Sequence, residues 1–467
     1  MIAHIAPLRR MPRRFDYFDY AVPEGMVVSR GDLVLIPFRS ATLRGVVLSL
    51  SDEVPVKPIK PITSVVHPSF VSDGRLKILE RLAHDLIQST ASLLHIALQK
   101  KPKREPKRAA VSSARIKQTE VPYLRTAIDL VKSQQRSFIE IFDLVQGAAL
   151  AEGIRKSVPG ITWVIVPHHH DALTVPEAMT RVDVLSSSEK PDTIVILRSG
   201  CAEHASYDRN PRYDVRDFAE LAAEIYGTRV VYADVMPRVR ELSLATIKST
   251  ERVPADVVDL RAESKSGNMV KLLSPKVLEA IDGALQSGKS VLLSYNRREQ
   301  EVDRTLREQF ANTPILHIEK GFEAERSDKP TILLATRYFT ESIYEPLDPP
   351  NLGLIADLQA DIGLHGGEYD AIEQSIIRLY ELRGIATRLQ VPFIVQTYDG
   401  ALVQQIMQSP HVLLQSEREA RKALNYPPFG VLLKVGDEEK RMTQEAFEQQ
   451  KPSLKVLDDA IIIQVCH

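Results

Sequence analysis

From about residue 120 onward, the chain alternates segments of helical spacing with short apolar runs. In order, the runs are ITWVIVP, DTIVIL, RVVYADV, SVLLSY, PILHI, TILLAT, NLGLIADL and PFIVQTY. This alternation is typical of parallel sheets, because each helix carries the chain back to the edge at which the next strand begins. The runs suffice for two sheets, so the pattern predicts two doubly wound α/β lobes.

Residues 1 to about 70 have a different pattern, with the short alternating segments FDYAVP, DLVLIPF and LRGVVLSL. The residues that separate them are typical of turns: Pro23, Gly25, Gly31 and Pro37. Short strands between turns predict a small β-barrel or sandwich. A single helix is predicted over residues 74–98. The stretch after it is rich in lysine and arginine, which indicates either a solvated linker or a tract that neutralises nucleic-acid phosphates.

Composition excludes several classes of protein. Lysine and arginine number 60 and aspartate and glutamate 61, so the net charge identifies no partner. The two cysteines, Cys201 and Cys466, are too few for a disulfide framework or a four-cysteine zinc site. The sequence has no apolar run long enough for a signal peptide or a membrane span. We therefore expect a cytoplasmic protein that carries no metal or other cofactor.

The octapeptide GALQSGKS, residues 283–290, matches the pattern of a phosphate-binding loop. Such a loop follows a strand and opens a helix, whose free N–H groups bind the phosphates. Here a helical pattern begins at Ser274 and ends near Gly288, and a strand is predicted from Ser290 to Tyr295. The predicted order is helix, loop and strand, and a helix C-terminus disfavours phosphate. The alternative, a nucleotide site that uses Lys289, requires that Lys289→Ala abolish turnover.

Further stretches occur in order along most of the chain. They are FDYAVPEG, GDLVLIPF, GVVLSLSDE, NPRYDVRDFAELAAEIYGTRVV, LSPKVLEAIDGALQSGKSVLLSYNRR, NLGLIADLQADIGL, EQSIIRLYELRG, PFIVQTYD and REARKALNYPPFG. Together they resemble the PriA (primosomal protein N′) family of replication-restart helicases. The first three resemble that family's 3′ DNA-end-binding barrel. The fourth resembles the segment after its Walker B motif, and the fifth resembles the start of its second helicase lobe.

The resemblance implies an α/β fold in which a small N-terminal β-barrel precedes two RecA-like parallel α/β helicase lobes. The implied domains are a 3′ DNA-end-binding domain over 1–98, a basic linker over 99–120, lobes over 121–260 and 261–399, and a truncated C-terminal domain over 400–467. The family's cysteine-rich zinc module is missing after Asn296–Arg298, and its winged-helix domain is reduced to the basic linker.

The resemblance also locates the family's ATP site, and its residues are substituted here. Aligned without gaps, the family's phosphate loop falls on DLVQGAALAE, so Leu150 replaces the lysine and Ala151 the threonine that reaches magnesium. The D-E-E-H of Walker B falls on Cys201 to His204, and the arginine finger becomes Ile385. The degenerate ATP site thus comprises Gly147, Leu150, Ala151, Cys201, Ala202 and Ile385. These substitutions predict that ATP hydrolysis is lost.

The best candidate binding site is the pocket that captures a 3′ DNA end in this family. The resemblance places it at Phe18, Asp19, Tyr20, Arg39 and Lys60. An aromatic ring for stacking, a carboxylate that accepts from a sugar hydroxyl and a lysine for phosphate suit this task. Because FDYFDY repeats the triplet, either copy could form the pocket. Alternatively, the aromatic residues are simply core residues of the barrel.

Two further features of the sequence are weak candidates for functional sites. His168 to His170 with Asp171 contain metal-ligand side chains, but adjacent residues of one extended segment cannot all converge on a single ion. Cys201 stands alone, which favours packing over reactivity.

These observations predict a DNA-binding replication-restart protein of the primosome that recognises stalled forks or 3′ ends without ATP-driven unwinding. It would act at the nucleoid beside other primosome or single-strand-binding proteins. The alternatives are a reduced but active ATP-dependent 3′–5′ helicase, and a scaffold whose lobes contact only proteins.

Overall fold

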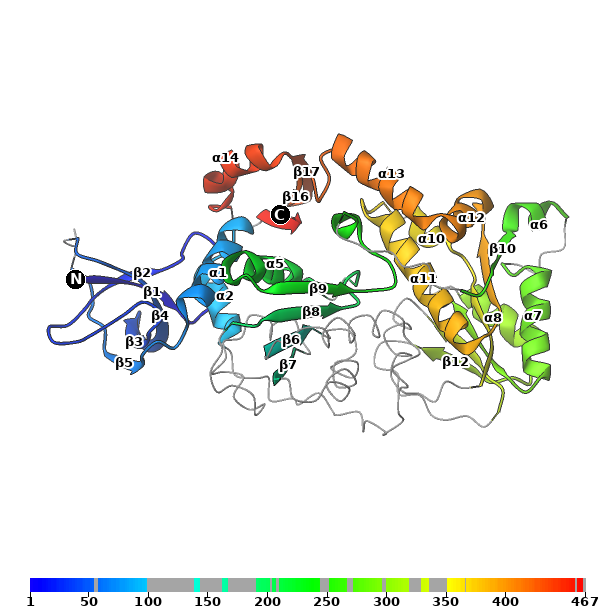
Figure 1. Cartoon of the computed structure of the whole chain (residues 1–467), viewed down its shortest axis with the longest axis horizontal. Coiled ribbons are helices and arrows are strands. Elements are labelled where there is room, and N and C mark those ends of the chain that lie inside the picture. The colour runs from blue at the N-terminus through cyan, green and yellow to red at the C-terminus, as the bar shows by residue number, and fades with distance from the viewer. Residues whose placement is uncertain are drawn as a thin grey trace. The chain divides into compact units, whose positions relative to one another are not determined.

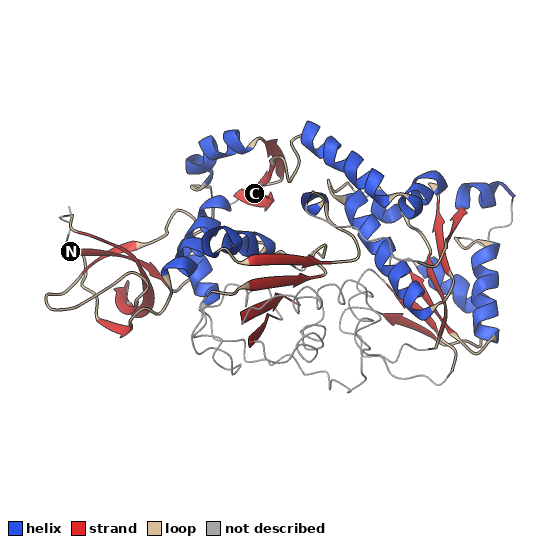
Figure 2. Ribbon diagram, in the orientation of Figure 1, coloured by secondary structure: helices blue, strands red, loops and turns tan. Residues whose placement is uncertain are grey.

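The computed structural model describes side chains in residues 1–53, 58–98, 190–201, 204–206, 210–243, 252–265, 272–295, 301–318, 329–335, 351–365 and 367–457. It describes the backbone alone of residues 266 and 300 and of the strands at 138–142, 162–166 and 460–464. The chain forms two compact units, shown as ribbons in Figures 1 and 2. The first unit holds the described residues up to Ala233 and those from Arg421 onward. The second holds those from Asp234 to Ala420.

The N-terminal sheet is antiparallel and five-stranded, in the order β2-β1-β4-β3-β5. Its strands are β1 (Ile2–Pro7), β2 (Phe18–Ala21), β3 (Leu33–Phe38), β4 (Ala41–Ser51) and β5 (Ser64–His67). Ala21, at the end of β2, donates its N–H to the Lys60 carbonyl (3.0 Å) and accepts from Ile62 N–H (2.9 Å), so the segment before β5 bonds to the opposite edge. The predicted antiparallel sheet is confirmed, and its closure into a barrel stays a prediction.

Two helices follow this sheet, so the prediction of one continuous helix over 74–98 is wrong. Helix α1 (Asp73–Asp85) begins after Ser72, whose hydroxyl accepts from Arg75 N–H, and α2 (Thr90–Ala97) begins after Ser89. Ile87 adopts a left-handed conformation between them, and Gln88 N–H donates to the Ala83 carbonyl (2.7 Å). This helix-terminating hydrogen bond satisfies a carbonyl that would otherwise be exposed at the end of α1. Periodicity alone does not reveal it.

A four-stranded parallel sheet completes the centre of the first unit. Its order is β7-β6-β8-β9, from β6 (Phe138–Phe142), β7 (Thr162–Val166), β8 (Thr193–Leu197) and β9 (Arg229–Ala233). Helix α5 (Val215–Tyr226) connects β8 to β9. Asp214 caps its start by accepting from Arg216 N–H, and Gly227 ends it with a positive φ of 68°. Aspartate before the helix and glycine after it are the residue types that these positions favour.

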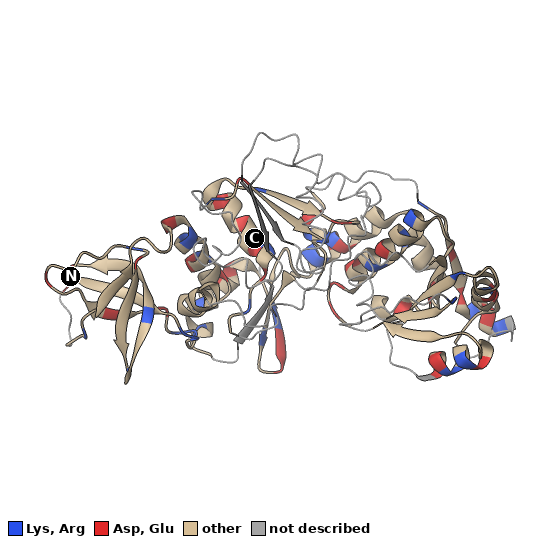
Figure 3. Cartoon of the chain, turned by 90° about the horizontal axis from the view of Figure 1, so that it is seen from below, with Lys and Arg blue, Asp and Glu red and all other residues tan. Residues whose placement is uncertain are grey.

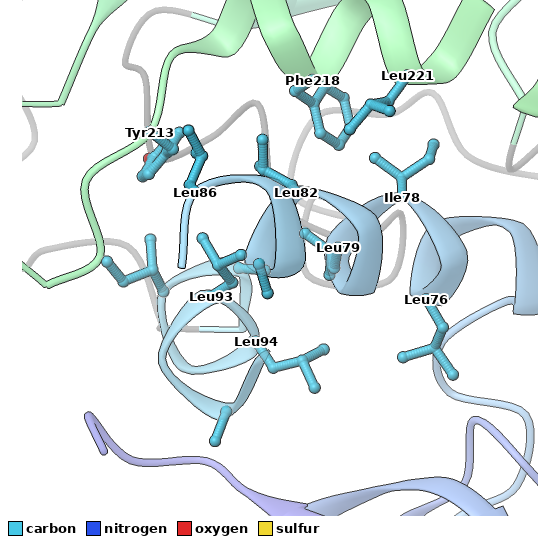
Figure 4. Packing of buried hydrophobic residues seen from close by; sticks show 14 of the residues in the cluster. Leu76, Ile78, Leu79, Leu82, Leu86, Leu93, Leu94, Tyr213, Phe218 and Leu221 are labelled. Atoms are coloured by element: carbon cyan, nitrogen blue, oxygen red, sulfur yellow. The ribbon is translucent and has the colours of Figure 1, made fainter. Parts of the chain in front are cut away.

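The core of the first unit lies where α1 and α2 pack between the N-terminal sheet and α5 (Figure 1). Figure 4 shows Ile78, Leu79 and Leu82 of α1 facing Phe218 and Leu221 of α5. The Arg75 guanidinium lies 4.9 Å from the centre of the Phe218 ring. This packing explains why α1 carries apolar residues on more than one side.

The C-terminal residues of the first unit form a separate antiparallel sheet of order β17-β16-β18, with one helix. The elements are β16 (Val431–Val435), β17 (Glu438–Met442), α14 (Gln444–Leu454) and β18 (Ala460–Gln464). Phe447 and Leu454 of α14 join the same core cluster as α1 and α2. Segments at opposite ends of the sequence therefore share one hydrophobic core.

The second unit is built on a six-stranded parallel sheet of order β10-β15-β14-β11-β13-β12. Its strands are β10 (Ala255–Asp259), β11 (Ser290–Ser294), β12 (Ile315–Ile318), β13 (Ile332–Ala335), β14 (Leu352–Asp357) and β15 (Phe393–Thr397). Its helices are η5 (Val239–Glu241), α6 (Leu260–Ser266), α7 (Pro275–Gln286), α8 (Gln300–Gln309), α10 (Asp361–Leu364), α11 (Ala371–Leu389), α12 (Gly400–Gln408) and α13 (Pro410–Ala423). Every apolar run singled out in the sequence contains a parallel strand, which confirms two parallel α/β sheets.

The segment GALQSGKS has the predicted order of helix, loop and strand. The Ser274 hydroxyl accepts from Val277 N–H (3.2 Å) and starts α7, while Gly288 has a φ of 73° at its end. Ser290 then opens β11. Lys289 N–H donates to the Ala284 carbonyl (3.0 Å), so the backbone group that a phosphate loop would offer is used by the end of the helix.

No helix in the described part of the chain combines the length and apolar character needed to cross a membrane.

Candidate nucleic-acid interface

The second copy of the repeated triplet, Phe18-Asp19-Tyr20, lies in β2, antiparallel to β1. The register pairs Ile5 with Phe18 and His4 with Asp19. Because successive side chains of a strand point to opposite faces, Asp19 faces away from Phe18 and Tyr20. The strand therefore divides the three predicted pocket residues between its two faces.

Tyr20 faces the core of the N-terminal sheet and is 4% exposed. Its hydroxyl donates to the Pro37 carbonyl (3.3 Å), and burial raises the pKa of the phenol. Tyr20 therefore ties β2 to β3 through this hydrogen bond, and its ring packs in the small core that includes Ala3 and Ile36. For Tyr20, this position agrees with the alternative prediction that the aromatic residues are core residues of the N-terminal domain.

Asp19 lies on the exposed face of β2, with 48% of its side chain accessible. The His4 ring nitrogen Nδ1 lies 2.7 Å from Asp19 Oδ1, and the Tyr17 ring meets the His4 ring edge-on at 4.8 Å between centroids. One carboxylate oxygen of Asp19 thus has a protein partner, and the side chain is open to solvent. An exposed, oriented carboxylate is suited to accept a hydrogen bond from a hydroxyl group.

Phe18 stands at the centre of a row of aromatic rings. Its centroid lies 5.7 Å from that of Phe15, at an interplanar angle of 23°, and 5.4 Å from that of Phe38, at 74°. The Arg14 guanidinium lies 5.0 Å from the centre of the Phe15 ring. We call Phe15, Phe18 and Phe38 the aromatic row. All three rings are partly or largely exposed, so a base could stack at the end of the row.

Arg39 and Lys60 meet at the turn between β3 and β4. Arg39 has a φ of 56°, a left-handed conformation that favours glycine. The Lys60 ammonium donates to the Arg39 carbonyl (3.4 Å), and both side chains are exposed. Since Lys60 also accepts from Ala21 N–H at the end of β2, the structure brings Arg39 and Lys60 close to the aromatic row. Phosphate oxygens would find two cations there.

The first copy of the triplet, Phe15-Asp16-Tyr17, precedes β2 and is held differently. The Ser89 hydroxyl donates to the Phe15 carbonyl (2.6 Å), and Asp16 Oδ1 accepts from Thr90 N–H (3.1 Å). The Lys455 ammonium donates to Asp16 Oδ2. Asp16 is thus engaged by two other segments, whereas Asp19 is exposed.

Only part of the predicted degenerate ATP site falls within the described residues. Cys201 is half-buried, and its carbonyl accepts from Arg216 Nη1 (3.2 Å). Ile385 is 1% exposed on α11. Gly147, Leu150, Ala151 and Ala202 lie outside the described residues, as do the histidines at 168–170. No cluster of three metal-ligand side chains occurs among the residues that the structure describes.

Sequence reasoning missed His4 and Phe38. The His4–Asp19 pair depends on the antiparallel register of β1 and β2, which no local pattern specifies. Phe15 carried a signal, because the repeated triplet placed it next to the predicted pocket. Figure 3 shows lysine and arginine interspersed with acidic residues along the described elements, so the candidate interface depends on local geometry more than on a large field.

The aromatic row beside exposed arginine and lysine has the side-chain types that nucleic-acid-binding domains use. Comparison with known proteins agrees, since residues 10–99 match the model of the PriA 3′ DNA-binding domain (3′BD). The replication restart protein PriA of Synechocystis sp. is 30% identical over 97 residues. Residues 10–99 are therefore similar to the 3′ DNA-binding domain of PriA proteins.

The match to the Synechocystis protein is confined to a short segment. It covers 20% of this chain and 12% of that relative. The similarity therefore concerns a 3′ DNA-binding domain and not the whole of the relative.

Proposed function

We propose that this protein binds DNA at stalled replication forks through the 3′ end of a nascent strand, without ATP-driven unwinding. It would serve there as a platform on which other primosome or single-strand-binding proteins reload the replicative helicase. The single observation that carries the proposal is the 3′ DNA-binding domain of residues 10–99, in which Phe18 and Asp19 stand next to each other in an edge strand.

The chemistry around β2 suits a strand end, because β2 is an edge strand and a ligand at the edge of a sheet can reach side chains on both of its faces. A terminal base would stack on the aromatic row, Asp19 would accept from the 3′ hydroxyl, and Arg39 or Lys60 would contact the last phosphates. Because Asp19 and Tyr20 face opposite sides of β2, Tyr20 would act through the sheet and not on the DNA. Capture of an end and docking of partners require only surfaces, whereas unwinding also requires phosphate and magnesium ligands.

The experiment uses a fork with a 3′-OH leading-strand end and the same fork with a 3′-phosphate. We expect the protein to bind the 3′-OH fork about tenfold more tightly, because a phosphate dianion would face the Asp19 carboxylate. Affinity is measured by fluorescence anisotropy, and ATP hydrolysis is recorded in the same samples. Equal affinity for both forks would contradict end recognition, and negligible affinity for either would favour the protein-only scaffold.

The second candidate is a reduced but active ATP-dependent 3′–5′ helicase, and GALQSGKS is the observation in its favour. The geometry around Lys289 opposes it, because the loop follows a helix and the Lys289 N–H is already bonded within that helix end.

We expect Lys289→Ala to leave fork binding and the background rate of phosphate release unchanged, within about twofold. The side chain is exposed at the end of α7, where its loss affects little packing. A malachite-green assay with and without forked DNA measures the release. DNA-stimulated hydrolysis that disappears in Lys289→Ala would establish the helicase reading and overturn the motorless one.

A further inference from the structure

The repeated triplet carries out two different tasks in this fold. The second copy forms the edge strand β2, and the first copy lies in the connection before it. Both copies contain an aspartate, yet Asp19 is open to solvent and Asp16 is bound on both of its carboxylate oxygens. The two aspartates therefore differ in whether a ligand can reach them.

Asp16 contacts the start of helix α2 through one oxygen. Its Oδ1 accepts from the backbone N–H of Thr90 (3.1 Å) and from the Thr90 hydroxyl (3.4 Å). A carboxylate is favoured at this end of a helix, where N–H groups lack helical partners. Beside it, Ser89 holds the Phe15 carbonyl at 2.6 Å. Residues 15 and 16 are therefore fastened to a helix that is itself fully packed in the core.

The other oxygen of Asp16 accepts from Lys455, which ends helix α14 in the C-terminal segment. This helix is firmly seated. Phe447 is fully buried, and the Lys451 ammonium lies 2.7 Å from Glu448 and 3.6 Å from Asp85 of α1, with both Lys451 and Asp85 8% exposed at the side chain. Lys455 therefore extends from a fixed support to a carboxylate that is 26% exposed.

The same short connection carries the outer ring of the aromatic row. Phe15 stacks on Phe18 at 5.7 Å, and Asp16 is its chain neighbour. A path of contacts thus runs from Lys455 to Asp16, and through its neighbour Phe15 to Phe18, the central ring of the aromatic row on which a base is expected to stack. Ordering of Asp16 by Lys455 restricts the positions that the Phe15 ring can adopt.

We propose that Asp16 is a positioning residue that couples the C-terminal segment to the DNA-binding face, with the Lys455–Asp16 ion pair as the link. The triplet duplication separates the two roles: Asp16 anchors the row and Asp19 remains available to the DNA end. The inference rests on the proposed function for its ligand. Because coupling is reciprocal, DNA on the aromatic row also strengthens docking of the C-terminal segment.

The test compares four variants of the full chain: Asp16→Asn, Lys455→Met, the double variant, and Lys455→Arg. The matched control is Lys440→Met, which removes an exposed lysine of the same segment whose ion pair, among the described residues, is with Glu438 of β17. We expect Asp16→Asn and Lys455→Met each to weaken binding of a 3′-OH single strand by about threefold to tenfold. The double variant should bind this strand no more weakly than the single variant with the lower affinity. Lys455→Arg should keep wild-type affinity, since it keeps the charge.

Two readouts separate this inference from the proposed function. The ratio of affinities for 3′-OH and 3′-phosphate ends should stay unchanged in Lys455→Met, whereas Asp19→Asn should reduce it. Amide hydrogen exchange, measured without DNA, should become faster at residues 14–20 in Lys455→Met and remain at the wild-type rate in Lys440→Met. If the wild type shows no end preference, the proposed function fails and the exchange result still decides the coupling. The coupling would be overturned if the affinity losses of the two single variants multiplied in the double variant. Unchanged amide exchange at residues 14–20 in Lys455→Met would overturn it as well.

Discussion

Replacing Phe18 with alanine is expected to weaken binding of a 3′-OH single strand by about fivefold to a hundredfold. Stacking of one base on one aromatic side chain contributes about 1–3 kcal/mol, and Phe18 is the central ring of the aromatic row. Its removal also leaves Phe15 and Phe38 without their common neighbour, so neither remaining ring keeps its orientation. The expected loss therefore exceeds that of removing either outer ring.

The measurement is fluorescence anisotropy of a labelled oligonucleotide, repeated at several salt concentrations. Stacking is apolar, so the slope of affinity against salt should match the wild type while the affinity itself falls. Phe70→Ala is the matched control, because Phe70 is also partly buried, packs edge-on against His67 and lies outside the aromatic row. An equal loss of affinity in both variants would show that Phe18 acts through stability of the domain.

The largest effect on stability is expected for Phe218→Ala, which should lower the free energy of unfolding of the first unit by about 3–5 kcal/mol. Phe218 is 1% exposed and fills the space between α5 and α1, where Figure 4 shows it facing the leucines of α1. Truncation leaves a cavity that a close-packed interior fills only in part. It also removes the ring that lies 4.9 Å from the buried Arg75 guanidinium.

Urea unfolding followed by circular dichroism measures this change. Leu424→Ala is the control, since 54% of Leu424 is exposed and surface truncations usually change stability by less than about 0.5 kcal/mol. A loss below about 1 kcal/mol for Phe218→Ala would contradict the assignment of α1 and α5 to one core. Phe218→Ala should also lose 3′-end binding at the urea concentrations where it begins to unfold, because α1 and α2 pack against the N-terminal sheet as well.

The parallel sheets could be predicted from the sequence because their signal is local. Strands such as Ile332–Ala335 and Thr193–Leu197 are buried along their whole length. Strands that are buried on both faces consist of continuous runs of mainly apolar residues, which can be recognised in the sequence. Edge strand β10, Ala255–Asp259, escaped prediction because an edge position permits the mixed residues Ala-Asp-Val-Val-Asp. The break between α1 and α2 escaped it because Ile87, an apolar residue, takes the left-handed position where glycine or asparagine is usual.

The candidate site divides in the same way. Phe18, Asp19, Arg39 and Lys60 could be proposed from the sequence because residue types and their order along the chain carry the resemblance, and these depend on no distant contact. The pairing of β2 with β1 decided on which face of the sheet each of these residues lies. It places Asp19 beside His4 and buries Tyr20 in the core.

The sequence by itself determined that this chain builds parallel α/β sheets behind an antiparallel N-terminal domain, and that GALQSGKS ends a helix. Those features follow from periodicity and from residues that start or stop helices, which act over a few positions. Only the tertiary structure decided which aspartate of the repeated triplet is open to solvent, since Asp16 is engaged by Thr90 and by Lys455, whereas Asp19 is 48% exposed. Contacts across so much of the chain arise from packing of whole elements, and no local pattern records them.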